Sequence, residues 1–165
     1  MILFQTDELK VAPIDPGDLP ALFEVYKQCE DFLALGPVSE ASLQMVREDI
    51  DRSRSENGQY CAIRNHQGHL IGVLDFSVNG GDDSTSILSL LMIAASWRNK
   101  GYGQTLVNVL EMYLKEKYKI ERIASGVQTN NSGAIRFWKR LGYDLSTEPR
   151  PMPDGTVVYE MTKVL

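Results

Sequence analysis

The segment Ile87–Ile93 constrains the fold more than any other part of the chain. Its seven residues are apolar except for Ser89. Such a continuous apolar run is typical of a strand that is covered on both faces, as in a sheet with helices on each side. The sequence therefore favours an α/β architecture with this strand near the centre of the sheet.

The neighbouring segments predict helices and further strands around this central strand. Gly103–Tyr118 and Ser132–Leu141 have apolar residues at helical spacing, and Gly142 follows the second helix in the C-cap position. Two earlier helices are expected, one capped by Asp18 and one opened by Ser39. The other expected elements are strands at Lys10–Ile14, Tyr60–Arg64, Leu70–Val78, Ile123–Val127, Tyr143–Leu145 and Thr156–Met161, with a turn at Asn79–Asp83.

The length and charge of the chain limit the class of protein. A chain of 165 residues and 18.5 kDa fits a single domain over residues 1–165. The formal net charge of −5 disfavours a nucleic-acid-binding protein, because such domains usually carry a basic patch. The expected fold is therefore one α/β domain, with a mixed sheet of about seven strands flanked by about four helices.

The cysteines and the apolar segments bear on the location of the protein. Cys29 and Cys61 form no C-x-x-C pair, so no metal site is indicated, and reduced thiols are favoured over a disulfide. Met1–Phe4 is too short for a signal peptide. The longest nearly apolar stretch, Ile87–Ala95, is too short to span a membrane. A cytoplasmic protein with no membrane partner and no metal is therefore expected.

The turn after the central strand carries the first chemical signal. Its sequence, Arg98-Asn99-Lys100-Gly101-Tyr102-Gly103-Gln104, leads into the N-terminus of a helix. Glycines allow a phosphate to approach the backbone, and a helix N-terminus offers unpaired N–H groups to an anion. Arg98 and Lys100 add positive charge. A plain helix cap is the alternative interpretation. A nucleotide-hydrolysing loop is excluded because no G-K-[ST] is present, and a dinucleotide fingerprint is excluded because Leu106 replaces its third glycine.

A second segment makes the first one more specific. The run Asn131-Ser132-Gly133-Ala134-Ile135-Arg136-Phe137-Trp138-Lys139-Arg140-Leu141-Gly142-Tyr143 follows one helix and one strand after the glycine turn. Together, the two segments resemble the R-x-x-G-x-G turn and the N-x-x-A-x-x-[LF]-Y-x-[KR]-x-G-[FY] helix of the GNAT N-acetyltransferase superfamily. An amphipathic helix that only packs against the sheet is the alternative for the second segment.

The resemblance covers nearly the whole chain and implies a binding mode for acetyl-CoA. In this superfamily the cofactor lies in a gap where the central parallel strands splay apart. The backbone of Leu91, Met92 and Ile93 would then pair with pantetheine, although these residues could also be plain core. The resemblance further implies that the amides of Asn99–Gln104 hold the pyrophosphate, and that Asn131 binds the pantetheine arm.

The resemblance also implies direct attack of an amine on the thioester, with the oxyanion bound by a backbone N–H near Ile93. Trp138 stands where many relatives have a tyrosine that protonates the departing sulfur. An indole N–H cannot give up its proton in this way, so Trp138 would line the thiol site and the general acid is unassigned. Asp75, in an apolar strand beside the gap, is the candidate base. A solvent-facing or backbone-satisfied Asp75 is the alternative.

The expected function is acetyl-CoA-dependent acetylation of a primary amine on a small molecule or a peptide. Glu30 and Asp31 are further candidates that could attract a cationic acceptor. A non-catalytic module that senses acyl-CoA is the alternative, and the tryptophan at position 138 favours it. The family resemblance is also compatible with a homodimer.

Overall fold

The computed structural model describes residues 1–79, 82–146 and 148–165, which form a single mixed sheet with helices on both faces. The strands lie in the order β1-β2-β3-β4-β5-β6-β9-β7, and β8 pairs with the outer part of β9. Among the described strands, only β5 and β6 pair in parallel. The strands are β1 Phe4–Gln5, β2 Leu9–Pro13, β3 Gln59–Asn65, β4 Leu70–Ser77, β5 Thr85–Ile93, β6 Arg122–Gln128, β7 Asp144–Leu145, β8 Arg150–Pro151 and β9 Val157–Val164.

The helices divide between the two faces of the sheet. One core cluster joins α4 and α5 to Leu74, Phe76 and Leu88, and the other joins α1 and α3 to Val73 and Met92. Alternate residues of β4 therefore point to opposite layers, as the pleat of a strand requires. The helices are α1 Leu19–Gln28, α2 Glu30–Leu33, α3 Leu43–Ser55, α4 Tyr102–Tyr118 and α5 Ser132–Arg140, with 3-10 turns at Pro16–Asp18 and Ala95–Trp97.

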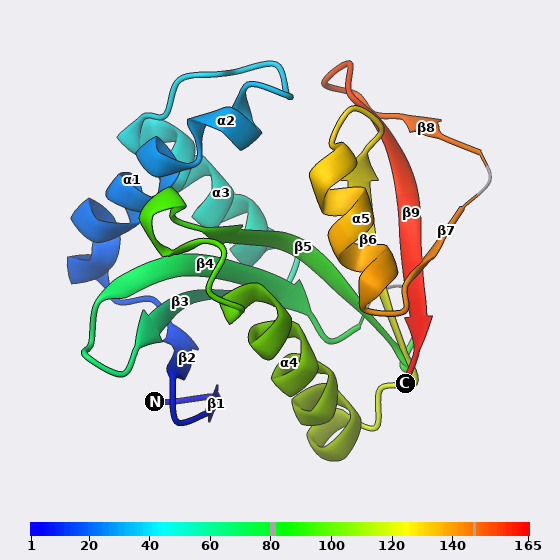
Figure 1. Cartoon of the computed structure of the whole chain (residues 1–165), viewed down its shortest axis with the longest axis horizontal. Coiled ribbons are helices and arrows are strands. Elements are labelled where there is room, and N and C mark those ends of the chain that lie inside the picture. Colours follow the sequence, from blue (N-terminus) through cyan, green and yellow to red (C-terminus); the bar gives the residue numbers. More distant parts are fainter. Residues whose placement is uncertain (80–81, 147) are drawn as a thin grey trace.

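The central parallel pair separates at a β-bulge. Leu88 pairs with Phe76 and Leu90 pairs with Asp75, so Ser89 is an extra residue in β5. A bulge of this kind bends the strand and disrupts pairing. The parallel ladder to β6 ends at Leu88, where the Ser125 hydroxyl donates to the Leu88 carbonyl over 2.9 Å. Figure 1 shows that β5 and β6 lie together near the C-terminus of the chain and separate toward the other end of the two strands.

The structure confirms the α/β class and corrects several details of the prediction. Within the described residues the sheet has nine strands rather than about seven, because β1 and β8 contain only two residues each and show no period. Helix α3 begins at Leu43 rather than at Ser39. The Ser42 hydroxyl accepts the Met45 N–H over 3.1 Å and is the actual N-cap.

Other local differences have equally local causes. Asp18 stands at the N-cap of α1, but its carboxylate accepts from the Asp15 N–H and from Arg64 instead of capping the helix. The four-residue helix α2 is too short to show a helical period. The turn expected at Asn79–Asp83 includes residues 80–81, which lie outside the described residues. Within the described ranges, no helix is long and apolar enough to cross a membrane.

Candidate active site

The glycine turn has the backbone geometry of an anion site. It follows the splayed end of β5 and leads directly into α4. Gly101 is the N-cap of α4 with φ of +83°, and Asn99 also has a positive φ, of 61°. A Cβ at position 101 would meet no atom within 4 Å, so the space beside the turn is open. The first amides of α4 and the positive end of its dipole face this space, as an anion requires.

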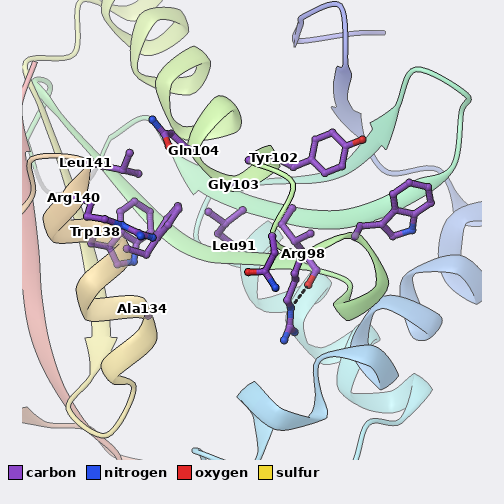
Figure 2. A pocket seen from close by; sticks show the side chains of 14 residues that line it. Leu91, Arg98, Tyr102, Gly103, Gln104, Ala134, Trp138, Arg140 and Leu141 are labelled. Carbon is purple, nitrogen blue, oxygen red and sulfur yellow. Dashed lines mark hydrogen bonds between the residues drawn. The ribbon is translucent and has the colours of Figure 1, made fainter.

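The two sequence segments line one cavity of 660 Å³. The glycine turn and β5 form one wall, and α5 forms the other. Figure 2 shows Ala134 and Trp138 of α5, with Leu141 directly after this helix, on the opposite side of the cavity from Leu91 and Gly103. This space, called here the cofactor cavity, is lined by Leu91, Ile93, Trp97, Arg98, Asn99, Gly101, Tyr102, Gly103, Gln104, Ala134, Phe137, Trp138, Arg140 and Leu141.

Two residues of β5 direct their backbone groups toward the gap left by β6. Hydrogen-bonded and non-hydrogen-bonded pairs alternate along an antiparallel ladder. The Ala94 N–H donates to the Ile71 carbonyl over 2.8 Å, next to the Gly72–Ile93 pair. Ile93 therefore belongs to a non-hydrogen-bonded pair, as does Leu91 two residues earlier. Their N–H and C=O groups face the side on which β5 has no strand partner among the described residues.

The structure places most, but not all, of the predicted cofactor-binding residues at the cofactor cavity. Nine of the twelve line the cofactor cavity, and Lys100, Met92 and Asn131 do not. Lys100 donates to the Ser96 carbonyl over 3.2 Å and lies over the Trp97 ring. Met92 is buried on the α1–α3 face. The Asn131 amide oxygen caps α5 by accepting the Ala134 N–H over 3.1 Å, and the residue lines the adjoining cavity described below.

Sequence reasoning missed four residues on the wall formed by α5. Ala134, Phe137, Arg140 and Leu141 line the cofactor cavity, but none was proposed to bind the cofactor. Three of them, with Trp138, follow the i, i+3, i+4, i+7 spacing of one helix face. The sequence interpretation treats that spacing as packing, and the structure shows that the same face also lines the cofactor cavity.

Arg98 is a cavity residue whose guanidinium is engaged with the protein. Its Nε donates to the Ile93 carbonyl over 2.8 Å, and its two terminal nitrogens lie 2.6 and 3.1 Å from the Asp31 carboxylate. This ion pair lowers the pKa of Asp31, chiefly through the hydrogen bond from Arg98.

Trp138 lies at the junction of two cavities and is almost fully buried. Its ring packs edge-on against Phe137 and Tyr143, with ring centroids 5.1 and 4.9 Å away. The Tyr143 hydroxyl donates to Glu111 over 3.0 Å, and burial raises the pKa of Tyr143. Tyr143 therefore faces α4 and does not replace the missing tyrosine acid.

Two further cavities continue from the cofactor cavity to the other face of the sheet. The first, the splay cavity, measures 400 Å³, lies between β5 and β6, and shares Leu91, Ala134 and Trp138 with the cofactor cavity. The second, the α2–α3 cavity, also measures 400 Å³ and shares Phe32, Leu90 and Gln128 with the splay cavity. A path of lining residues thus connects the glycine turn with the space beside α2 and α3.

The α2–α3 cavity is predominantly acidic. Glu48, Asp49 and Asp154 line it, against the single guanidinium of Arg52. Asp49 is fixed by two donors, the Tyr26 hydroxyl at 2.7 Å and Arg52 at 2.6 Å. The cavity therefore combines apolar walls with negative charge, a composition that suits a cationic ligand.

Asp75, the predicted base, lies beneath α3. The Ser53 hydroxyl donates to its Oδ1 over 2.6 Å, and burial raises the pKa of Asp75. A Cβ at Gly58 would approach this carboxylate to 2.9 Å. Asp75 is not among the residues that line the cofactor, splay or α2–α3 cavities. Its action as a base therefore remains a prediction, and it would need a group between it and the amine.

The other polar candidates also have protein partners. Glu30 accepts the Ala41 N–H over 2.8 Å, and Asp31 pairs with Arg98. Cys29 and Cys61 are free and buried. Burial raises the pKa of the Cys61 thiol to about 12, and it also raises the pKa of Cys29. Both are protonated at neutral pH and are poor nucleophiles.

Comparison with known proteins places this architecture in a family. The sequence profile of the acetyltransferase (GNAT) family matches residues 19–143, which is more than half of the sequence. The chain therefore belongs to the GNAT acetyltransferase family.

Individual relatives agree with this assignment. The spermine/spermidine N(1)-acetyltransferase of Bacillus subtilis (strain 168) is 33% identical over 61 residues, which are 37% of this chain and 40% of that protein. The alignment thus spans less than half the length of this curated relative. An acetyltransferase structure from Thermus thermophilus has a TM-score of 0.76 at 21% identity, with full coverage of both chains. A Vibrio cholerae spermidine N-acetyltransferase, solved with CoA and spermine, has a TM-score of 0.72 at 17% identity over 96% of each chain.

Proposed function

We propose that the protein is an N-acetyltransferase that transfers the acetyl group of acetyl-CoA to a primary amine of a small molecule or peptide. One observation carries the proposal: the glycine turn, the splayed end of β5 and one face of α5 line a single cavity of 660 Å³. This cavity offers helix amides at one end and, along the wall formed by β5, backbone groups of a strand that has lost its partner on that side. Family membership agrees with the assignment.

The residues of the cofactor cavity suit acetyl-CoA. The open space beside Gly101 accommodates a diphosphate at the N-terminus of α4. The backbone groups of Leu91 and the N–H of Ile93 offer the pantetheine arm hydrogen bonds like those of a neighbouring strand, whereas the Ile93 carbonyl already accepts from Arg98.

Acetyl-CoA supplies a thioester. The ammonium first loses a proton to a base or to water, and the neutral amine then attacks the thioester carbonyl. The nitrogen loses its second proton to water, and the tetrahedral intermediate collapses as the bond to sulfur breaks and the thiolate leaves. A backbone N–H of the splayed strand near Ile93 would stabilise the oxyanion.

The connected cavities provide a route for the amine. An amine that enters through the α2–α3 cavity reaches the splay cavity past Phe32, Leu90 and Gln128. The carboxylates of Glu48 and Asp49 would attract its ammonium form, which predominates at neutral pH. Two relatives are named for acetylating spermine or spermidine, so polyamines are the first acceptors to test.

The departing thiolate needs no strong acid in this account. Trp138 would line the thiol site without giving up a proton. A thiol has a pKa of about 8.5, so its thiolate leaves readily near neutral pH and takes a proton from water afterwards. Replacement of Trp138 by phenylalanine should therefore leave the shape of the pH–rate profile unchanged.

The test combines binding and turnover. We expect acetyl-CoA to raise the melting temperature while ATP and NAD do not. We also expect thiol release when acetyl-CoA is mixed with polyamines or other primary amines. The absence of a thermal shift with any CoA species would remove the cofactor assignment.

A non-catalytic acyl-CoA sensor is the second candidate, and the tryptophan at position 138 favours it. A thermal shift with acetyl-CoA but no thiol release across a broad amine panel would select the sensor. The two functions are therefore distinguished by one pair of measurements on the same preparation.

A further inference from the structure

Trp138 stands where the cofactor cavity meets the splay cavity. The two cavities share Leu91, Ala134 and Trp138 as lining residues. The proposed cofactor reaches this junction from the glycine turn, and the proposed amine reaches it from the α2–α3 cavity. The thioester must therefore lie at the junction for the two reactants to meet. Of the three shared residues, Trp138 alone has a polar atom in its side chain.

The indole N–H of Trp138 is a donor without a protein partner. Trp138 is only 6% exposed, and an indole N–H can donate a hydrogen bond but not accept one. Within the part of the chain that the structure describes, this nitrogen forms no hydrogen bond, whereas every fully enclosed side-chain nitrogen and oxygen does. The indole nitrogen therefore borders open space rather than packed protein. The open spaces that Trp138 lines are the cofactor cavity and the splay cavity.

The surrounding contacts hold the indole in one orientation. Its ring packs edge-on against Phe137 and Tyr143, with centroids 5.1 and 4.9 Å away. The Tyr143 hydroxyl donates to Glu111 over 3.0 Å, and the Tyr143 N–H donates to the Trp138 carbonyl over 3.1 Å. Lys163 contacts both carboxylate oxygens of Glu111, at 3.1 and 3.0 Å. A donor fixed in this way needs no rearrangement when charge develops beside it.

The two walls of the junction suit different atoms of the thioester. Figure 2 shows Trp138 across the cavity from Leu91 of β5. The backbone of β5 offers N–H groups to the carbonyl oxygen, so the sulfur is the atom left for a donor on α5. When the carbon–sulfur bond breaks, its electron pair passes to the sulfur, which becomes a thiolate. A hydrogen bond to a charged acceptor is stronger than one to a neutral acceptor.

We propose that the indole N–H of Trp138 donates a hydrogen bond to the sulfur of the departing CoA thiolate and keeps its own proton. The inference rests on the proposed acetyl transfer and deepens it, since it gives the leaving group a specific partner. The thiolate takes its proton from water after the transfer. Trp138 thus stabilises the leaving group as an anion and does not protonate it.

The first test compares CoA with desulfo-CoA, in which hydrogen replaces the thiol group. At about pH 9, above the ordinary thiol pKa of about 8.5, we expect Trp138→Phe to weaken CoA binding about tenfold more than desulfo-CoA binding. Lost packing affects both ligands, so the difference isolates the contact with sulfur. At about pH 6.5, where the thiol is protonated, the difference should fall below about threefold. Equal losses for the two ligands at the higher pH would overturn the inference.

The second test uses the two tryptophans of the chain as probe and control. Trp97 also lines the cofactor cavity, close to the glycine turn. At about pH 8, the indole N–H NMR signal of Trp138 should differ between the CoA and desulfo-CoA complexes of the wild type, and that of Trp97 should not. Trp97→Phe assigns the two signals, so this comparison holds even if Trp138→Phe does not fold. A Trp138 signal that is identical in both complexes would contradict the hydrogen bond.

Turnover gives a third readout. For Trp138→Phe we expect kcat to fall about 10- to 100-fold, as for the loss of one hydrogen bond to a charged group. The shape of the pH–rate profile should stay the same, because the indole transfers no proton. A profile that loses an acidic limb in the variant would mean that position 138 supplies a proton. That result, or a kcat within about threefold of the wild type, would refute the proposed role.

The outcomes separate this inference from the proposed function. If the wild type binds CoA but acetylates no amine, the proposed transfer fails, and the two ligand comparisons alone decide the contact between Trp138 and sulfur. If amines are acetylated but Trp138→Phe weakens CoA and desulfo-CoA equally, the proposed function stands and this inference fails.

Discussion

The two sides of the splayed sheet are built in different ways. The cofactor side consists of one continuous stretch, Leu91–Gln104, and one face of α5. Its expected contacts come from backbone amides and from glycines that permit close approach. The proposed acceptor side, which is the α2–α3 cavity, is assembled from α1, α2, α3, the end of β6 and Asp154, and it presents side chains. A backbone site depends on few positions, whereas a side-chain site can change with almost any substitution around it.

This difference between the two sides predicts which substitutions change CoA affinity and which change stability. Changes on the cofactor side should alter CoA affinity, and changes among the buried polar groups under α3 should alter stability without altering CoA affinity. Trp138, at the junction of the cavities, should affect both.

Trp138→Ala should have the largest effect on stability. Removing a buried indole that packs against Phe137 and Tyr143 leaves a cavity, at a cost of about 3–5 kcal/mol in the free energy of unfolding. Urea denaturation measures this loss. Trp138→Phe, which keeps an aromatic ring, is the control and should lose less. A loss below about 1 kcal/mol for the alanine variant would show that Trp138 does not hold α5 against the sheet.

Gly101→Val should weaken CoA binding by about 100-fold, as a β-branched residue both strains φ of +83° and occupies the open space beside the turn. Calorimetric titration gives the affinity. Gly68→Val is the matched control, because Gly68 has φ of +86° in the β3–β4 loop and is not among the residues that line the cofactor cavity. Both variants should be destabilised, but only Gly101→Val should lose affinity. An equal loss in both would mean that backbone strain alone explains the effect.

Tyr26→Phe tests the acceptor side. The Tyr26 hydroxyl donates to Asp49 over 2.7 Å and lies 2.5 Å from the Tyr60 hydroxyl, and burial raises the pKa of both phenols. Loss of these hydrogen bonds should reduce stability by about 1–3 kcal/mol, because Tyr60 and Asp49 lose a buried partner. The Kd for CoA should not change. A weaker CoA affinity in this variant would break the separation between the two sides.

Asp75→Asn should have the smallest effect on stability, and it should raise the free energy of unfolding rather than lower it. Burial raises the pKa of Asp75, so the folded state binds its proton more tightly than the unfolded state does. Stability should therefore rise as the pH falls from the raised pKa toward the ordinary value of about 3.9. Asparagine can still accept from Ser53 and has no charge to desolvate, so stability at neutral pH should increase by less than about 1 kcal/mol.

The control for this variant is Asp75→Ala, which loses the Ser53 hydrogen bond and should be less stable than the wild type. Thermal denaturation between neutral and mildly acidic pH distinguishes them. A destabilised Asp75→Asn would show that the charge itself stabilises the fold. An unaltered pH–rate profile in Asp75→Asn would remove Asp75 as the base.

The contrast between the two sides also explains what the sequence could predict. The central strand, the glycine turn and α5 each show their pattern within a short segment, and the structure brings them to one cavity. The bulge at Ser89 was not predicted, because one polar residue in an apolar run does not reveal a shift in pairing. The two-residue strands and α2 are too short to show a period.

Contacts between individual side chains could not be predicted from the sequence when the two partners lie far apart along the chain. The direction of the Arg98 guanidinium depends on Asp31, 67 residues away in sequence. Ser53 lies 22 residues from Asp75 and Tyr26 lies 34 from Tyr60, so these pairs were equally invisible in the sequence. The acidic α2–α3 cavity was missed because its carboxylates come from α3 and from the loop before β9, which only the folded chain brings together.

The location of the bound cofactor is the most direct test of this account. A competing space, a cavity of 710 Å³ between α1 and α3, includes Tyr60 and Arg47 among its lining residues. A titration with CoA, followed by amide NMR, distinguishes the two cavities. We predict that the largest shifts occur at Asn99–Gln104, Leu91 and Ile93, with little change around Tyr60. Shifts centred on the α1–α3 cavity, with the signals of the glycine turn unchanged, would contradict the assignment of CoA to the cofactor cavity.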